Sequence, residues 1–139
     1  FGDGMSVLSV ADGEGRNSVW LAEQGCAVTA TEISPVALEK AAKLARGRHV
    51  VVDFVQADIF DWTWPNEAFD AVVGIFIQFA PPPERERIIE GIRRSLKPGG
   101  LLILQGYTPK QIEFTRMPLP AHSRAALIVM PMTPDFAAP

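Results

Sequence analysis

Short apolar runs alternate with segments of helix-like periodicity along the first three quarters of the chain. The apolar runs fall at residues 7–10, 26–30, 50–55, 69–76 and 101–107. A near-continuous β-branched run, such as the third of these, is typical of a parallel strand that is buried on both faces of a sheet. The apolar runs therefore predict five strands, and the segments between them determine how the strands are connected.

Three of the intervening segments have the features of helices. Residues 18–24 are followed by Gly25, and glycine tolerates the left-handed conformation that often ends a helix. Ser34 can cap a helix and Pro35 suits its first turn, and apolar residues recur every three or four positions in the segment that follows. Residues 84–96 show the same spacing, after three prolines that a helix interior does not tolerate.

Alternating strands and helices indicate the α/β class. Strand–helix–strand units in series favour a doubly wound, Rossmann-like, mostly parallel sheet with right-handed crossovers. We expect its five parallel strands within one domain, residues 1–108. After Gly106 the composition changes, because no glycine follows while six of the twelve prolines do. Residues 109–139 are therefore expected to form an irregular, proline-rich extension, in which residues 125–130 have the composition of one more strand.

Composition and charge exclude several classes of protein. The 139 residues suit a single domain, and a net charge of −3 offers no basic face for a nucleic acid. No apolar run approaches the roughly 20 residues that cross a bilayer. The start has no signal peptide, so a cytoplasmic location is expected. The one cysteine, Cys26, excludes an internal disulfide and a cysteine metal cluster, and we expect no metal site.

A glycine loop between the first strand and the first helix is the strongest candidate for a binding site. It reads Asp-Gly-Glu-Gly over residues 12–15, and glycines there let the backbone turn sharply and approach a ligand. A G-x-G sequence alone is a weak signal. Glu32 strengthens it, because this residue lies at the expected carboxyl end of the second strand, where a carboxylate can accept both hydroxyls of a ribose. Together they predict a ligand that contains adenosine.

The charge of the loop favours one adenosine ligand over another. A dinucleotide places a pyrophosphate against such a loop. Asp12 and Glu14 would each repel it by roughly 1 kcal/mol or more at short range. S-adenosylmethionine has no phosphate and carries a sulfonium and an ammonium group. The third glycine of a dinucleotide fingerprint is also replaced, by Ser18. These features favour S-adenosylmethionine over a nicotinamide dinucleotide.

Five segments in order resemble the motifs of class I S-adenosylmethionine-dependent methyltransferases. They are VLSVADGEGRNSVWLAEQG, TATEISPVALEKA, VQADIFDW, FDAVVGIFIQF and LKPGGLLILQGYTP. The resemblance covers about Met5 to Pro109, and the EGRN run is similar to the small-molecule, tellurite-resistance-like branch. The family usually has an acidic residue, a glycine and often a cysteine where this chain has Ser9, Ala11 and Asp12.

The resemblance implies contacts with the methionine part of the cofactor from two places. The glycine loop would contribute Ala11, Asp12, Gly13 and Gly15. The end of the fourth strand would contribute Ile75 and Phe76.

The resemblance also implies a set of residues around the adenosine part. Glu32 would hold the ribose hydroxyls, with Ile33 against the adenine ring. Asp58 would accept the adenine amino group, with Ile59 beside the ring.

Methyl transfer is an in-line displacement, so the protein mainly has to align the acceptor and exclude water. A general base is needed only for a protonated nucleophile, and no catalytic residue is assigned. Ligands of open α/β sheets bind at the carboxyl ends of the strands. Gln78, Phe79 and Tyr107 follow the fourth and fifth strands and are the candidates for contact with a small-molecule methyl acceptor.

Three functions stay open at this point. The first is methyl transfer to a small molecule, and the second is a nicotinamide-dependent oxidoreductase. The third is a non-catalytic or incomplete methyltransferase-like domain, since relatives usually have helices before the first strand and a helix with two antiparallel strands after the fifth. An exposed edge at the fifth strand would also permit self-association.

Overall fold

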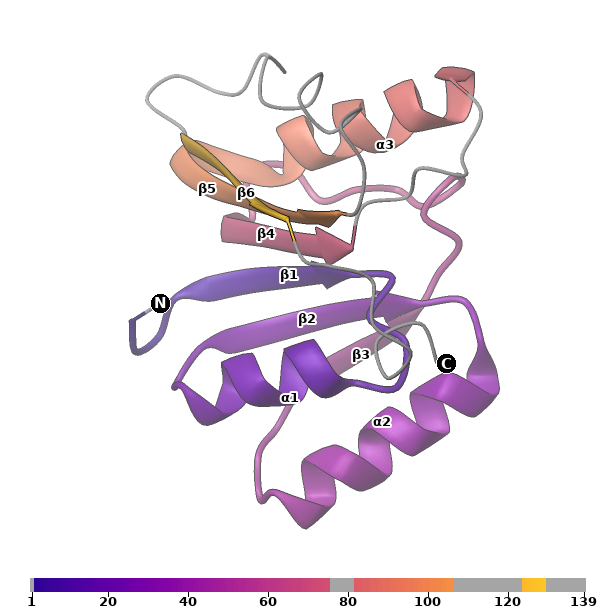
Figure 1. The fold of residues 1–139 in the computed structure, drawn as a ribbon, viewed down its shortest axis with the longest axis vertical. Helices are drawn as coiled ribbons and strands as arrows, with labels where there is room; N and C mark the ends of the chain where they lie inside the picture. Colours follow the sequence, from indigo (N-terminus) through magenta and orange to yellow (C-terminus); the bar gives the residue numbers. More distant parts are fainter. Residues whose placement is uncertain (1, 76–81, 107–123, 130–139) are drawn as a thin grey trace.

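The fold is a parallel sheet with helices packed against it (Figure 1), described by a computed structural model over residues 2–75, 82–106 and 124–129. In chain order its elements are β1 (Ser6–Val10), α1 (Arg16–Glu23), β2 (Ala27–Glu32), α2 (Pro35–Gly47), β3 (Asp53–Gln56), β4 (Phe69–Ile75), α3 (Pro82–Ser95), β5 (Leu96–Gly106) and β6 (Arg124–Val129). The strand order is β3-β2-β1-β4-β5-β6, and all neighbouring pairs are parallel.

The predicted fold class, a doubly wound Rossmann-like sheet, is confirmed. The chain winds outward from β1 through β2 to β3, then returns to β4 on the other side of β1 and continues to β5. The five expected strands are present, and β6 overlaps the segment whose composition suggested one more strand. Because β5 pairs with β4 and with β6, it is not an edge, and the prediction of an exposed edge there is wrong. The proposed domain boundary at residue 108 lies outside the described residues.

Two strand boundaries differ from the prediction for local reasons. The third strand begins later than residue 50, because Val50 caps the end of α2: its amide donates to the carbonyl of Ala45 in the last turn of that helix (3.1 Å). Val51 is accordingly 89% exposed. The fifth strand begins earlier than predicted, and residues 97–100 form an irregularity in its pairing with β4 rather than a separate turn. Gly99, with φ +82°, allows that irregularity.

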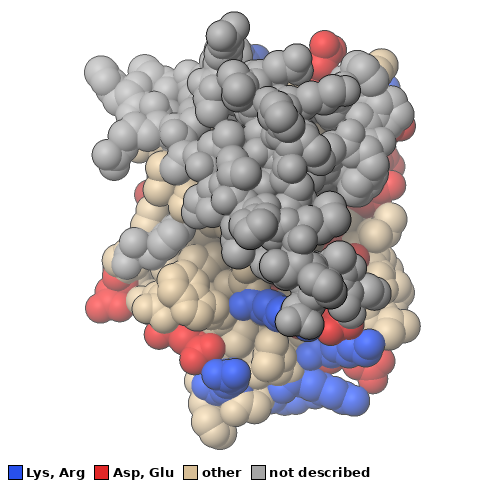
Figure 2. All heavy atoms as spheres, viewed as in Figure 1, with Lys and Arg blue, Asp and Glu red and all other residues tan. Residues whose placement is uncertain are grey.

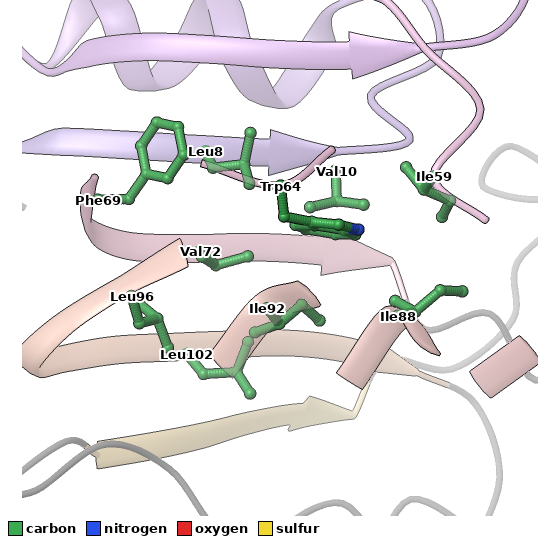
Figure 3. Close-up of a cluster of buried hydrophobic side chains, with 10 residues drawn as sticks. All are labelled: Leu8, Val10, Ile59, Trp64, Phe69, Val72, Ile88, Ile92, Leu96 and Leu102. Carbon is green, nitrogen blue, oxygen red and sulfur yellow. The ribbon is translucent and has the colours of Figure 1, made fainter. Parts of the chain in front are cut away.

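The sheet is buried on both faces, as its continuous apolar strands require. Along β1, Val7 packs with Leu21 of α1 on one face, while Leu8 packs with Ile92 of α3 on the other. Figure 3 shows the larger cluster, between the sheet and α3, which contains Leu8, Val10, Ile59, Trp64, Phe69, Val72, Ile88, Ile92, Leu96 and Leu102. Helices on opposite faces leave the carboxyl ends of the strands as the open edge where a ligand can bind.

Trp64 attaches the loop before β4 to α3. Its side chain is 7% exposed, lies in the cluster of Figure 3, and is tilted against Trp62 with ring centroids 5.1 Å apart. The same loop supplies amides to the last carbonyls of α3, from Glu67 to Arg94 (2.8 Å) and from Ala68 to Ser95 (2.9 Å). The aromatic residues of this loop therefore pack in the core rather than over a ligand.

We predict that Gly91→Ala destabilises the protein, although alanine favours helices by about 1 kcal/mol over glycine. A Cβ atom at Gly91 would overlap the indole of Trp64. The overpacking should lower the free energy of unfolding by about 2 kcal/mol net, measured by urea denaturation. In a Trp64→Leu background the same substitution should be neutral or stabilising. A Gly91→Ala protein as stable as the wild type would contradict the contact.

On the face shown in Figure 2, the described residues form no patch of a single charge. Lysine and arginine side chains lie among aspartate and glutamate side chains there, over the part of the chain that is not grey. No helix in residues 2–75 or 82–106 is long and apolar enough to cross a membrane.

Candidate functional site

The predicted binding residues meet where β1 and β2 end. β1 leads into the glycine loop, defined here as residues 11–15, and the loop leads into α1. β2 ends at Glu32, directly before α2. The two strands are paired in register from Ser6 with Ala27 onward, so their carboxyl ends lie side by side at the edge marked by the arrowheads in Figure 1.

The glycine loop is fastened to the end of β2 by three consecutive amides. The amide of Ala11 donates to Oγ1 of Thr31 (3.3 Å), and that of Asp12 donates to the carbonyl of Thr31 (2.9 Å). The amide of Gly13 donates to Oε1 of Glu32 (2.9 Å). The end of β2 therefore sets the shape of the loop. Sequence reasoning missed Thr31, whose only signal is a polar residue directly before Glu32.

Ala11 adopts a backbone conformation that favours glycine. Its φ is +51°, in the left-handed region, where a residue with a Cβ loses roughly 1–2 kcal/mol. This is the position at which the methyltransferases that the sequence resembles usually have glycine. The hydrogen bonds to Thr31 hold the residue there, so the change to alanine keeps the loop geometry at a cost in stability.

The two glycines of the loop meet different structural requirements. Both have positive φ, +65° for Gly13 and +93° for Gly15. A Cβ at Gly13 would meet no atom of the described residues within 4 Å, so the described part of the chain leaves the loop open there. A Cβ at Gly15 would lie 2.7 Å from the Cβ of Ala41 in α2. Gly13 therefore faces the space that a ligand can fill, whereas Gly15 allows α1 and α2 to pack closely.

Glu32 connects three elements through its carboxylate. Oε1 accepts from the amide of Gly13 and Oε2 accepts from the amide of Ser34 (3.0 Å). Each carboxylate oxygen has a second lone pair, so Glu32 can still accept the two hydroxyls of a ribose. Ile33 follows directly and is 58% exposed, which places an apolar side chain beside this carboxylate.

Asp12 points back into the protein instead of into open space. Its Oδ1 accepts from the hydroxyl of Ser9 (2.8 Å) and from the amide of Ser18 (3.1 Å), and its Oδ2 accepts from the hydroxyl of Ser18. Ser18 is the third residue of α1, and the N-cap residue Gly15 has no side chain. Asp12 therefore performs the capping that a side chain at the N-cap usually performs. The roles of Ser9 and Ser18, both buried, were not predicted.

The environment of Asp12 disfavours its charge. Burial raises the pKa of this carboxyl above its ordinary value of 3.8, and the nearby charge of Glu32 adds to the rise, while the hydrogen bonds from Ser18 and Ser9 oppose it. A raised carboxyl pKa means that the folded state binds the proton more tightly than the unfolded state. The folded state therefore loses stability as the pH rises from 3.8 through the raised pKa, and the loss is constant above it.

We predict that Asp12→Asn removes this pH dependence. The variant keeps one acceptor oxygen and loses the charge, so its unfolding free energy relative to wild type should improve as the pH rises from about 4 to about 7. Urea denaturation at a series of pH values measures the difference. The change of this difference with pH is diagnostic, because the lost hydrogen bond to Ser18 changes the free energy of unfolding of the variant by the same amount at every pH. A difference that is flat over this range would contradict the raised pKa.

The charge of Glu14 is balanced by α2. Its carboxylate pairs with the ammonium group of Lys40 at 3.2 Å, and both side chains are partly exposed. Lys40 therefore offsets the charge of Glu14, and the charge argument for the cofactor depends mainly on Asp12.

The predicted adenine-binding pair has a partly structural role. Oδ1 of Asp58 accepts from the amide of Phe60 (3.0 Å), which shapes the turn after β3. Ile59 is buried in the cluster of Figure 3, near Val10 and Ile88. The side chain of Ile59 thus packs in the core, and contact of either residue with adenine stays a prediction.

The remaining predicted residues lie at the end of β4 or beyond. Ile75 is the last residue of β4 and pairs with Gln105 of β5. Phe76, Gln78, Phe79 and Tyr107 lie outside the described residues, and their proposed contacts stay predictions. In the described part of the chain, no group of three His, Cys, Asp or Glu side chains is placed to hold a metal ion.

A family model described as a methyltransferase domain matches residues 7–100, more than half of the chain. The chain belongs to the methyltransferase domain family. The match covers β1 through α3 and the start of β5, with the glycine loop and Glu32 inside it. The class I methyltransferase resemblance is therefore confirmed, while the tellurite-resistance-like branch stays a prediction.

Individual relatives of this methyltransferase domain have different activities. The carboxy-S-adenosyl-L-methionine synthase of Aeromonas hydrophila is 36% identical over 84 residues, which is 59% of this chain and 33% of that enzyme. A S-adenosylmethionine-dependent methyltransferase of Methanosarcina mazei is 28% identical, with a TM-score of 0.68 over 75% of this chain and 53% of its own. The [4+2]-cyclase SpnF is 31% identical, with a TM-score of 0.66 over 73% of this chain and 38% of its own. The chain thus spans about a third of the length of the curated relative.

Proposed function

We propose that this methyltransferase domain binds S-adenosylmethionine at the glycine loop and transfers its methyl group to a small-molecule acceptor. One observation carries the proposal. Glu32 is held between the amides of Gly13 and Ser34 at the carboxyl end of β2, next to open space over Gly13, in a chain of the methyltransferase domain family.

The residues at the site fit an adenosyl cofactor. The carboxylate of Glu32 would hold the ribose hydroxyls through its remaining lone pairs. The exposed side chain of Ile33 would cover one face of the adenine. The space at Gly13 would take the 5′ substituent, since no atom of the described residues lies within 4 Å of the position that a Cβ would occupy there.

The chemistry needs little from ionisable residues. When bound, S-adenosylmethionine supplies a methyl group already activated by the sulfonium. The task of this chain is to fix that methyl in line with the acceptor and to exclude water. The hydrogen bonds from Ala11, Asp12 and Gly13 to the end of β2 make the cofactor side of the site rigid, which supports such alignment.

Two alternatives compete with unequal support. The family match favours a methyltransferase over a nicotinamide-dependent oxidoreductase. A domain that binds the cofactor without transferring a methyl group is the second candidate, because the chain spans about a third of its curated relative and the fold also serves a cyclase. A cytoplasmic location and a boundary near residue 108 remain part of the proposal. Self-association loses the basis that it had in an exposed edge at the fifth strand.

Calorimetry with S-adenosylhomocysteine and with NAD tests the cofactor, and labelled S-adenosylmethionine with thiol, amine and oxyanion acceptors tests the transfer. We expect S-adenosylhomocysteine to bind, NAD not to bind, and one class of acceptor to become labelled. Binding of S-adenosylhomocysteine without labelling of any acceptor would favour a domain that binds the cofactor but transfers no methyl group. A folded chain that does not bind S-adenosylhomocysteine at millimolar concentration would contradict the proposal.

A further inference from the structure

The carboxylate of Asp12 occupies the place at the N-terminus of α1 that an anionic ligand takes in phosphate-binding loops. In such loops, the helix dipole and unpaired amides bind the phosphate. Here the amide of Ser18, in the first turn of α1, already donates to Oδ1 of Asp12 at 3.1 Å. The hydroxyl of Ser18 donates to the other oxygen of the same carboxylate. The chain thus supplies its own anion.

Most of the other amides of the glycine loop are also engaged within the chain. Those of Ala11, Asp12 and Gly13 donate to Thr31 and Glu32 at the end of β2, and that of Gly15 donates to the carbonyl of Asp12 (3.4 Å). A phosphate at this loop would therefore find most of these donors in use. It would also approach the carboxylates of Asp12 and Glu32, while the nearby cation Lys40 is paired with Glu14.

We infer that Asp12 is a specificity-determining residue that excludes adenosine ligands with a 5′ phosphate. The inference rests on the proposed function only in taking this loop as the adenosine site. Asp12 does not need to touch the cofactor to act in this way. It holds the N-terminus of α1 with a fixed negative charge, which repels a phosphate and tolerates a neutral or cationic 5′ substituent.

Adenosine and ADP form a matched pair of probes, because they differ only in the 5′ pyrophosphate. The readout is the ratio of the dissociation constant of ADP to that of adenosine, measured by calorimetry on the whole chain. General damage to the loop weakens both ligands and leaves the ratio unchanged. The test variant is Asp12→Asn, which keeps the size and one acceptor of the side chain. The control is Ser9→Ala, which removes one hydrogen bond to Asp12 and leaves its charge in place.

We expect wild-type protein to prefer adenosine over ADP, and Asp12→Asn to lower the ratio by about tenfold or more. Asp12→Gly, which removes the resident acceptor altogether, should lower it further, and Ser9→Ala should leave it within about twofold of wild type. A ratio unchanged in both Asp12 variants, in protein that binds S-adenosylhomocysteine normally, would overturn this inference alone. Wild-type protein that binds neither adenosine nor S-adenosylhomocysteine would overturn the proposed function as well.

Discussion

Replacing Gly15 by alanine is expected to lower the free energy of unfolding by about 3 kcal/mol, a fall in melting temperature on the order of 10 °C. Two effects add at this position. The new Cβ would lie 2.7 Å from the Cβ of Ala41 and 3.0 Å from its Cα, so α1 and α2 would have to separate. The backbone at Gly15 also has φ +93°, which strains any residue with a side chain.

Two matched variants separate these effects in urea denaturation experiments. Gly13→Ala also places alanine at positive φ, but its Cβ has no neighbour within 4 Å among the described residues, so it should cost only about 1 kcal/mol. The double variant Gly15→Ala with Ala41→Gly removes the Cβ–Cβ contact and should recover part of the loss. If Gly13→Ala and Gly15→Ala cost the same, the close approach of α2 does not determine the need for glycine at residue 15.

The pattern of apolar residues was sufficient to predict most of the elements, because helices and strands follow from local periodicity. The parallel sheet was then predictable from the alternating order of strands and helices. Ser34 caps α2 as expected, with its hydroxyl accepting from the amide of Ala37 at 3.2 Å, and Pro35 is the first helical residue. The boundary of β3 was not predictable in this way. The β-branched run after α2 has the composition of a strand, but pairing with Thr29–Glu32 of β2 selects Asp53–Gln56.

The loop illustrates what local sequence does not contain. Gly13 and Gly15 look alike in the sequence, and only the position of Ala41, contributed by another helix, distinguishes them. The direction of the Asp12 side chain depends on Ser9 and Ser18 together, and neither residue suggests a contact by itself. The place of Glu32 at the end of β2 was predictable from the order of the strands and from the family motif, and its contact with a ribose stays a prediction. The hydrogen-bond pattern of the loop needed the fold.

In the C-terminal part of the chain, too, local sequence predicted an element but not its contacts. Composition identified residues 125–130 as strand-like, but their pairing was not predictable. β6 is parallel to β5, with Leu102 opposite Ala125 and Gly106 opposite Val129. A parallel partner requires a crossover, whose course depends on contacts far apart in the sequence. Among the described residues, the edge predicted at the fifth strand therefore lies at β6, and the opposite edge is β3.

Replacing Glu32 by alanine is expected to weaken binding of S-adenosylhomocysteine by about 100-fold, the largest effect on affinity of any single change at the site. A hydrogen bond to a charged group contributes roughly 1.5–3 kcal/mol, and the carboxylate would accept two from the ribose. The amides of Gly13 and Ser34 would also lose their partner, so the loop and the start of α2 should become less stable. Calorimetry at a temperature where both proteins are folded measures the change.

Loss of ribose recognition is distinguishable from a general loosening of the loop by comparing adenosine with 2′-deoxyadenosine. Wild-type protein should bind adenosine more tightly, because Glu32 accepts from the 2′-hydroxyl, whereas Glu32→Ala should bind both ligands equally. Glu39→Ala, which removes an exposed carboxylate from the following helix α2, is the control and should behave as wild type. A Glu32→Ala protein that keeps the preference for adenosine, or that binds S-adenosylhomocysteine within threefold of wild type, would show that the ribose lies elsewhere. In that case the loop would resemble the family in sequence without binding the ribose as the family does. The hydrogen bonds that Glu32 accepts from Gly13 and Ser34 would then only stabilise the fold.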